Sequence, residues 1–154
     1  MEAQLEQLTN AIDALTALDI DALTDTELHT AVIGLQRLGD RLTVITAPLL
    51  QRWHHRQVWA TDGSKSAAAR LSRETGTAKK TAARALHRAG ALASMPATTS
   101  AAAAGELSLD QVDLLARANT SERRDLFARD EQLLVGQVHE EVGQRDLLAV
   151  VGVV

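Results

Sequence analysis

Residues 62–90 read DGSKSAAARLSRETGTAKKTAARALHRAG and combine two short helix signals with a glycine-centred turn. Ser64 or Ser66 can act as the N-cap of the first helix, because a serine oxygen accepts a bond from a free amide of the first turn. Gly76 then ends that helix, and Thr77 can cap the next. A helix, a short turn with glycine and a second helix make the layout of a helix-turn-helix, whose second helix enters a DNA groove.

The second of these helices has an apolar stripe and a charged face. The stripe is built from Ala82, Ala85, Leu86, Ala89, Leu92 and Ala93, which recur at helical spacing. The opposite face presents Lys80, Arg84, His87 and Arg88. Phosphate contact is the simplest role for such cations. The predicted DNA-binding residues are Lys79, Lys80, Arg84 and Arg88, with assistance from Arg70 and Arg73.

Positive charge is concentrated around this segment. Residues 51–90 carry nine Lys and Arg against two acids, whereas the whole chain has a net charge of −4. Residues 1–50 and 91–154 are both acidic. A local basic block predicts an anionic partner such as double-stranded DNA, or an acidic partner within the same chain.

Composition indicates an all-α protein. The 154 residues include 27 Ala, one Phe, no Tyr and two Pro, so residues that favour helices dominate. We expect a multi-helix bundle with a long second helix and the helix-turn-helix-like pair in the middle. It forms a single domain or an N-terminal fragment of a larger one, with leucine-rich helices in 1–60, the basic segment in 62–95 and C-terminal helices in 96–154.

Several classes of protein are disfavoured. Because the chain has no cysteine, it has neither a disulfide framework nor a thiolate zinc site. The acidic start MEAQLEQLTNAI lacks the features of a signal peptide, and no apolar run is long enough to span a membrane. We therefore expect a cytoplasmic protein. No nucleophile–base pair, phosphate loop or metal cluster with suitable spacing is evident, so no catalytic residue and no metal ligand is assigned.

The leucine-rich part predicts two amphipathic helices. Thr24-x-x-Glu27 is a capping box for the second of them. A possible self-association seam consists of Leu28, Leu35, Leu42 and Leu49, which are seven residues apart, with Ala31, Leu38 and Ile45 in the companion positions. The seam can pair with the same helix in a second copy, giving a homodimer, or pack against the rest of its own chain. Pro48 predicts a kink or break in this helix.

In the C-terminal part, Pro96 starts a short helix that Gly105 ends, and Ser108-x-x-Gln111 is a second capping box. Two further helices are expected, over residues 122–129 and from Asp130 onward. Large rings are scarce, so we expect Trp53 and Trp59 to fill a core or an interface rather than to stack on bases. The apolar ending LLAVVGVV suggests a piece of a longer protein.

Two blocks of the sequence resemble the 13E12 repeat family, the domain of unknown function 222. They are the DG-x-x-S…RL…TG…A-x-x-A segment of residues 62–92 and the segment from Gly105-Glu106-Leu107-Ser108 through Ala118. One departure is Arg70, which precedes Leu71 where an aromatic residue is expected.

The resemblance implies an actinobacterial protein, often associated with mobile elements, in which this helical domain precedes an HNH endonuclease module. That module and its divalent metal are not present in this chain, since the histidines are scattered and no cysteine braces them. The leading hypothesis is therefore a DNA-engaging or regulatory N-terminal domain that is itself non-catalytic and needs no cofactor. The alternative is a helical protein–protein interaction or dimerisation module without direct nucleic-acid contact.

Overall fold

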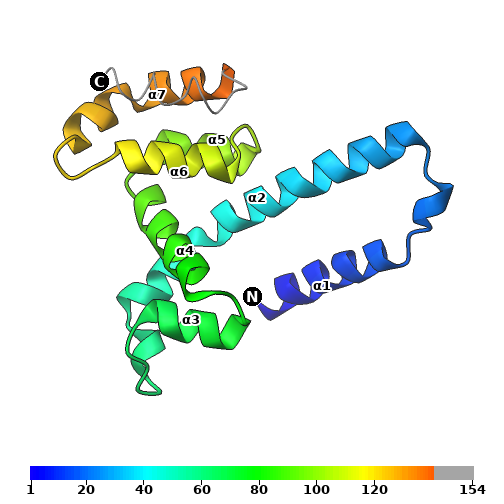
Figure 1. Ribbon diagram of the computed structural model, residues 1–154, viewed down its shortest axis with the longest axis horizontal. Helices are drawn as coiled ribbons and strands as arrows, with labels where there is room; N and C mark the ends of the chain where they lie inside the picture. Colours follow the sequence, from blue (N-terminus) through cyan, green and yellow to red (C-terminus); the bar gives the residue numbers. More distant parts are fainter. Residues whose placement is uncertain (141–154) are drawn as a thin grey trace. The chain divides into compact units, whose positions relative to one another are not determined.

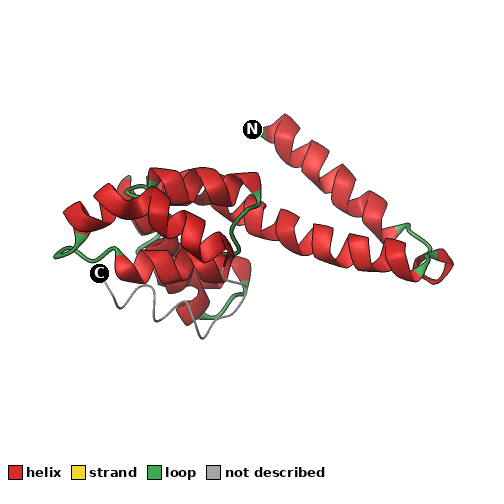
Figure 2. Cartoon of the chain, turned by 90° about the horizontal axis from the view of Figure 1, so that it is seen from above, coloured by secondary structure: helices red, strands yellow, loops and turns green. Residues whose placement is uncertain are grey.

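The structure is a computed structural model of the chain, and it describes residues 1–140. These residues form α-helices and two short 3-10 helices, without strands, joined by short loops (Figure 2). The prediction of an all-α fold is confirmed. The elements are α1 (Glu2–Thr16), η1 (Ile20–Ala22), α2 (Asp25–His55), η2 (Val58–Ala60), α3 (Ala67–Thr75), α4 (Lys79–Leu92), α5 (Pro96–Ala104), α6 (Leu109–Ala118) and α7 (Arg124–Glu140). The α-helices are labelled in Figure 1.

The chain divides into two compact units within α2. The first unit, Met1–Gln36, holds α1, η1 and the start of α2. Its Thr24 capping box is confirmed: the Thr24 amide donates to Glu27 Oε2 (2.9 Å), and the Glu27 amide donates to Thr24 Oγ1 (3.3 Å). The second unit, Arg37–Val154, contains every buried hydrophobic residue of the described part of the chain.

The core of the second unit lies between α2 and α4 to α7. α5 contacts α4, α6 and α7, α6 contacts α4 and α7, and α3 contacts α4. Met95 and Leu115 are completely buried. The other fully enclosed side chains are Val44, Val112, Val138 and Thr98. Aliphatic side chains and alanine thus fill most of this core, as the composition indicates, and Phe127 is its one aromatic residue among those described.

Two predictions about helix boundaries are wrong. α2 runs without a break from Asp25 to His55 although Pro48 lies inside it. The exposed Pro48 sits next to Ala47, and Val44 and Ala47 anchor that stretch of the helix in the core. The predicted helices over 122–129 and from Asp130 are the single helix α7, because Phe127, Leu134 and Val138 bury one continuous face.

Local capping signals of the second unit are largely confirmed. Ser108 and Gln111 form the predicted capping box at α6, and Pro96 occupies the first turn of α5. Trp53 and Trp59 are only partly buried and lie outside the buried core cluster. The apolar ending LLAVVGVV lies outside the described residues.

Asp40 and Arg41 on α2 hold the turn between α5 and α6. Arg41 Nε donates to the Ala103 carbonyl at the end of α5 (2.9 Å), and Asp40 Oδ2 accepts from the Leu109 amide at the start of α6 (3.3 Å). A cation therefore meets the negative end of one helix dipole, and an anion meets the positive end of the next. We call these two residues the α2 clamp.

Replacing Gly105 with alanine should lower the free energy of unfolding by about 1–3 kcal/mol. Gly105 has φ +86°, and an added Cβ would lie 2.9 Å from Arg41 Cδ. The substitution therefore strains the backbone and displaces the α2 clamp. Urea unfolding followed by tryptophan fluorescence measures the decrease.

Gly90→Ala is the matched control. Gly90 lies inside α4, and a Cβ there meets no atom within 4 Å. This variant should gain up to about 1 kcal/mol from helix propensity. Equal effects of the two substitutions would contradict the role given to the turn.

Candidate nucleic-acid interface

α3 and α4 form the predicted pair of helices around a glycine turn. Ser66 Oγ accepts from the Ala69 amide (3.2 Å), which confirms Ser66 as the N-cap of α3. Gly76 follows α3 with φ +70°, a left-handed conformation that glycine adopts without strain. Ala67 and Ala82 are buried, and small side chains at these positions allow helices to approach closely.

The N-terminus of α4 lacks the predicted cap. Thr77 does not cap α4, because its carbonyl accepts from Ser72 Oγ (2.6 Å) and its hydroxyl lies 2.9 Å from Thr75 Oγ1. The N-cap is Ala78, which has no side-chain oxygen to offer. The first amides of α4 are therefore left for water or for an anionic ligand.

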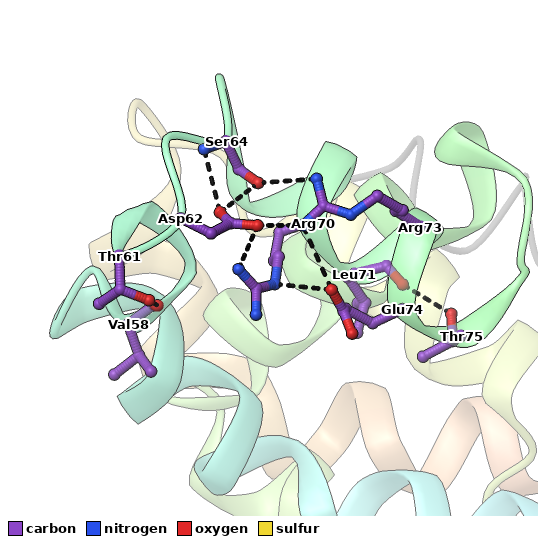
Figure 3. Close-up of polar contacts among 9 residues, drawn as sticks. All are labelled: Val58, Thr61, Asp62, Ser64, Arg70, Leu71, Arg73, Glu74 and Thr75. Carbon is purple, nitrogen blue, oxygen red and sulfur yellow. Dashed lines mark hydrogen bonds and ion pairs between the residues drawn. The ribbon is translucent and has the colours of Figure 1, made fainter.

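The two predicted DNA-binding residues on α3 are held in an ion-pair network (Figure 3). Asp62 pairs with both Arg70 and Arg73, and Glu74 Oε1 lies 3.1 Å from Arg70 Nε and accepts from Arg73 Nη2 (3.2 Å). Ser64 joins the network by donating from its hydroxyl to Asp62 Oδ1 (2.7 Å) and accepting from Arg73 Nη1 (3.2 Å). Two carboxylates thus offset the two guanidinium charges.

The network also keeps Asp62 ionised. The neighbouring Arg70 guanidinium first, and then the hydrogen bond from Ser64, hold the pKa of the Asp62 carboxyl well below its usual range. A carboxylate whose pKa is lowered on folding stabilises the fold at neutral pH, and this contribution disappears only as the pH falls through the lowered pKa. Arg70 and Arg73 therefore remain paired at physiological pH.

Arg88 does not face outward, contrary to the prediction. Its residue is 8% exposed, and its Nε and Nη2 each donate to one carboxylate oxygen of Asp113 at 2.6 Å. This bidentate pair joins α4 to α6. A guanidinium held in this way fastens two helices together and offers little to a phosphate, so Arg88 leaves the candidate interface.

Among residues 1–140, three of the six predicted DNA-binding residues are both exposed and unpaired, and they lie in the first two turns of α4. They are Lys79, Lys80 and Arg84, for which the described residues provide no ion-pair or hydrogen-bond partner. Lys79 and Lys80 occupy the first turn, where the helix dipole disfavours a cation. An arrangement that costs local stability is more typical of a binding site than of a structural feature.

The family comparison covers this part of the chain together with most of the rest. A family model described as a domain of unknown function, DUF222, matches residues 29–142, well over half of the chain. The chain belongs to the DUF222 family. The matched DUF222 region contains α3, α4 and the whole described part of the second unit, and it leaves out α1. No curated protein and no solved structure gives a significant match.

Two further features of the DUF222 domain bear on its chemistry. Within residues 1–140, no group of three or more His, Asp or Glu side chains is placed to hold a metal ion. None of the described helices is both long and apolar enough to cross a membrane.

The sequence predicted the exposed cations of this site. It did not predict the acids that pair with Arg70, Arg73 and Arg88. Glu74 is four residues beyond Arg70, a spacing that signals an ion pair on one helix. Asp113 is 25 residues away from Arg88 on another helix, and no local pattern connects them.

Proposed function

We propose that this DUF222 domain is a non-catalytic DNA-engaging domain that holds the phosphate backbone with the start of α4. The observation that carries the proposal is the exposed cluster of Lys79, Lys80 and Arg84 beside the uncapped N-terminus of α4. Amide groups at a helix N-terminus and lysine side chains are both common ligands of phosphate.

The proposal concerns binding to the DNA phosphate backbone rather than recognition of the base sequence. Two lysines and one arginine are suited to phosphates, and only Arg84 could also reach a guanine edge. The ion-pair network of Asp62 and the Arg88–Asp113 pair support the interface indirectly, because they fix α3 and α4 in place. In a parent protein of the type implied by the family resemblance, an HNH module would supply the cutting chemistry.

Lys80→Glu/Arg84→Glu should weaken binding to a fluorescently labelled DNA duplex about 10-fold or more at moderate salt, because the variant replaces two phosphate interactions with repulsion. The slope of log affinity against log salt should fall by about one for each phosphate that the variant no longer neutralises. Fluorescence anisotropy at several salt concentrations measures both quantities.

Arg123→Glu/Arg124→Glu is the control, since it makes the same change in net charge at exposed residues before and at the start of α7. This variant should bind nearly as well as the wild type. Wild-type binding that is absent or insensitive to salt would contradict the proposal. So would an equal decrease in both variants, which would indicate a general effect of charge.

A further inference from the structure

The first unit carries a row of apolar side chains that nothing in the described chain buries. On α1, Leu5, Leu8, Ile12 and Leu15 alternate at spacings of three and four residues, the pattern of a coiled-coil seam. All four are exposed, Leu5 by 57% and Ile12 by 51%. No residue of α1 is buried, so packing within the first unit does not hold this helix.

α2 carries a second row with the same spacing. Leu28, Leu35, Leu42 and Leu49 are all exposed, as are Leu38 and Ile45 between them. Further along the helix, Val44 and Ala47 are buried in the second unit. α2 is thus apolar on two faces there, one of which forms the core while the other is uncovered.

A short helix whose apolar face is exposed needs another surface to pack against. Helices of about 15 residues are marginally stable alone in water, and most of their stability in proteins comes from packing one apolar face. The 15 residues of α1 include four exposed large aliphatic side chains on one stripe. Patches of this kind mark interaction surfaces.

Along most of their length the rows have no charged residue beside them, and the acids that flank them, Glu2, Asp25 and Glu27, lie at the first residue of each row. Residues 1–36 contain seven acids and no Lys or Arg. Glu6 and Asp13 each follow a seam residue by one position and therefore point about 100° away from it. The positions beside the rows are mostly small or uncharged, and they include Thr9, Ala11 and Gly34. Away from these ends, two such surfaces can meet without bringing like charges together.

The glycines of α2 add a second argument. Gly34 and Gly39 flank the row, and a Cβ at either position meets no atom within 4 Å. Glycine costs about 1 kcal/mol relative to alanine inside a helix. These glycines leave shallow holes beside the leucines of α2. Apolar side chains of an α1 row, which have the matching spacing, can insert into these holes.

We infer that a second copy of this chain covers the rows, so that α1 and the first half of α2 from each copy form a four-helix bundle. The rows of α1 and α2 share one spacing, so α1 of each copy can pack on α2 of the other about a two-fold axis. This inference does not depend on DNA binding, and it is tested without nucleic acid.

Sedimentation velocity from low to high micromolar concentration should show a dimer of the wild-type chain. Leu8→Asp/Leu35→Asp places one carboxylate on each row, and by symmetry every dimer would bury two of each. The dissociation constant should rise about 100-fold or more, because burying an unpaired carboxylate is strongly unfavourable. The variant should sediment as a monomer.

Gln7→Asp/Gln36→Asp is the matched control. Each of these exposed residues is the sequence neighbour of a substituted leucine, and the change in charge is the same. The control should remain a dimer. Leu8→Ala/Leu35→Ala keeps high helix propensity, so a weaker dimer in this variant reports missing leucine packing between the copies rather than unfolding of the helices.

Tryptophan fluorescence shows whether the second unit stays folded, since Trp53 and Trp59 both lie there. Its urea unfolding should be similar in the wild type and the seam variants. A wild-type monomer at every concentration would overturn the inference and favour closure of the rows within one chain. A dimer that survives the aspartates, or one that the glutamine controls also disrupt, would overturn it as well.

Discussion

Asp113→Ala should lower the free energy of unfolding by about 3–5 kcal/mol, because it leaves the buried Arg88 guanidinium without its counter-ion. The side chains of Arg88 and Asp113 are 9% and 17% exposed, so water cannot replace the missing carboxylate without disturbing the packing of α4 on α6. Two charge-assisted hydrogen bonds disappear at once. Few single substitutions in this chain should cost more.

Urea unfolding followed by tryptophan fluorescence and circular dichroism measures this effect. Asp110→Ala, at an exposed position of the same helix, is the control and should change stability by less than about 1 kcal/mol. Arg88→Met/Asp113→Leu removes both charges and should recover most of the stability, since an apolar pair of similar volume replaces a buried ion pair at little cost. Similar decreases for Asp113→Ala and Asp110→Ala would contradict the structural role of the pair.

Glu131→Ala should cost about 3 kcal/mol, the second-largest decrease that we expect from a single substitution. Glu131 is 4% exposed on α7, and its Oε1 accepts from the amide and the hydroxyl of Thr98, both at 2.8 Å. Thr98 lies in the first turn of α5, where free amides and the helix dipole favour an anion. Removing the carboxylate leaves two buried donors unsatisfied and opens a cavity.

Two milder variants separate the contribution of the Thr98 hydroxyl from that of the Glu131 charge. Thr98→Val removes the hydroxyl but retains the amide, and Glu131→Gln retains an acceptor but removes the charge. Each should cost roughly 1–2 kcal/mol in the same urea experiment. If Glu131→Ala lowered the free energy of unfolding no more than alanine at the exposed neighbour Gln132, the contacts of Glu131 with Thr98 would not contribute to stability.

The sequence was sufficient where the structural signal is local. Ser108 with Gln111, Ser66 and Gly105 all act on the helix end next to them, so a few residues determine the outcome. The all-α composition likewise leaves few alternatives for the fold class.

The sequence alone was insufficient where a residue contacts a partner that is distant in the chain. Arg88 continues the charged face of α4 by spacing, yet Asp113 on α6 turns it into a buried structural residue. Pro48 is a helix breaker by propensity, but burial of neighbouring residues holds α2 together. In both cases tertiary packing overrides a local rule, and only the folded chain reveals it.

The α2 clamp imposes an evolutionary constraint on related sequences. Asp40 and Arg41 meet the ends of α5 and α6 in a fixed order, the anion at a helix start and the cation at a helix end. Exchanging the two residues would oppose both dipoles. Since the space beside Arg41 depends on a residue without a Cβ at position 105, a larger residue there should appear together with a shorter side chain at position 41. Co-variation between these two segments across the DUF222 family would record the contact.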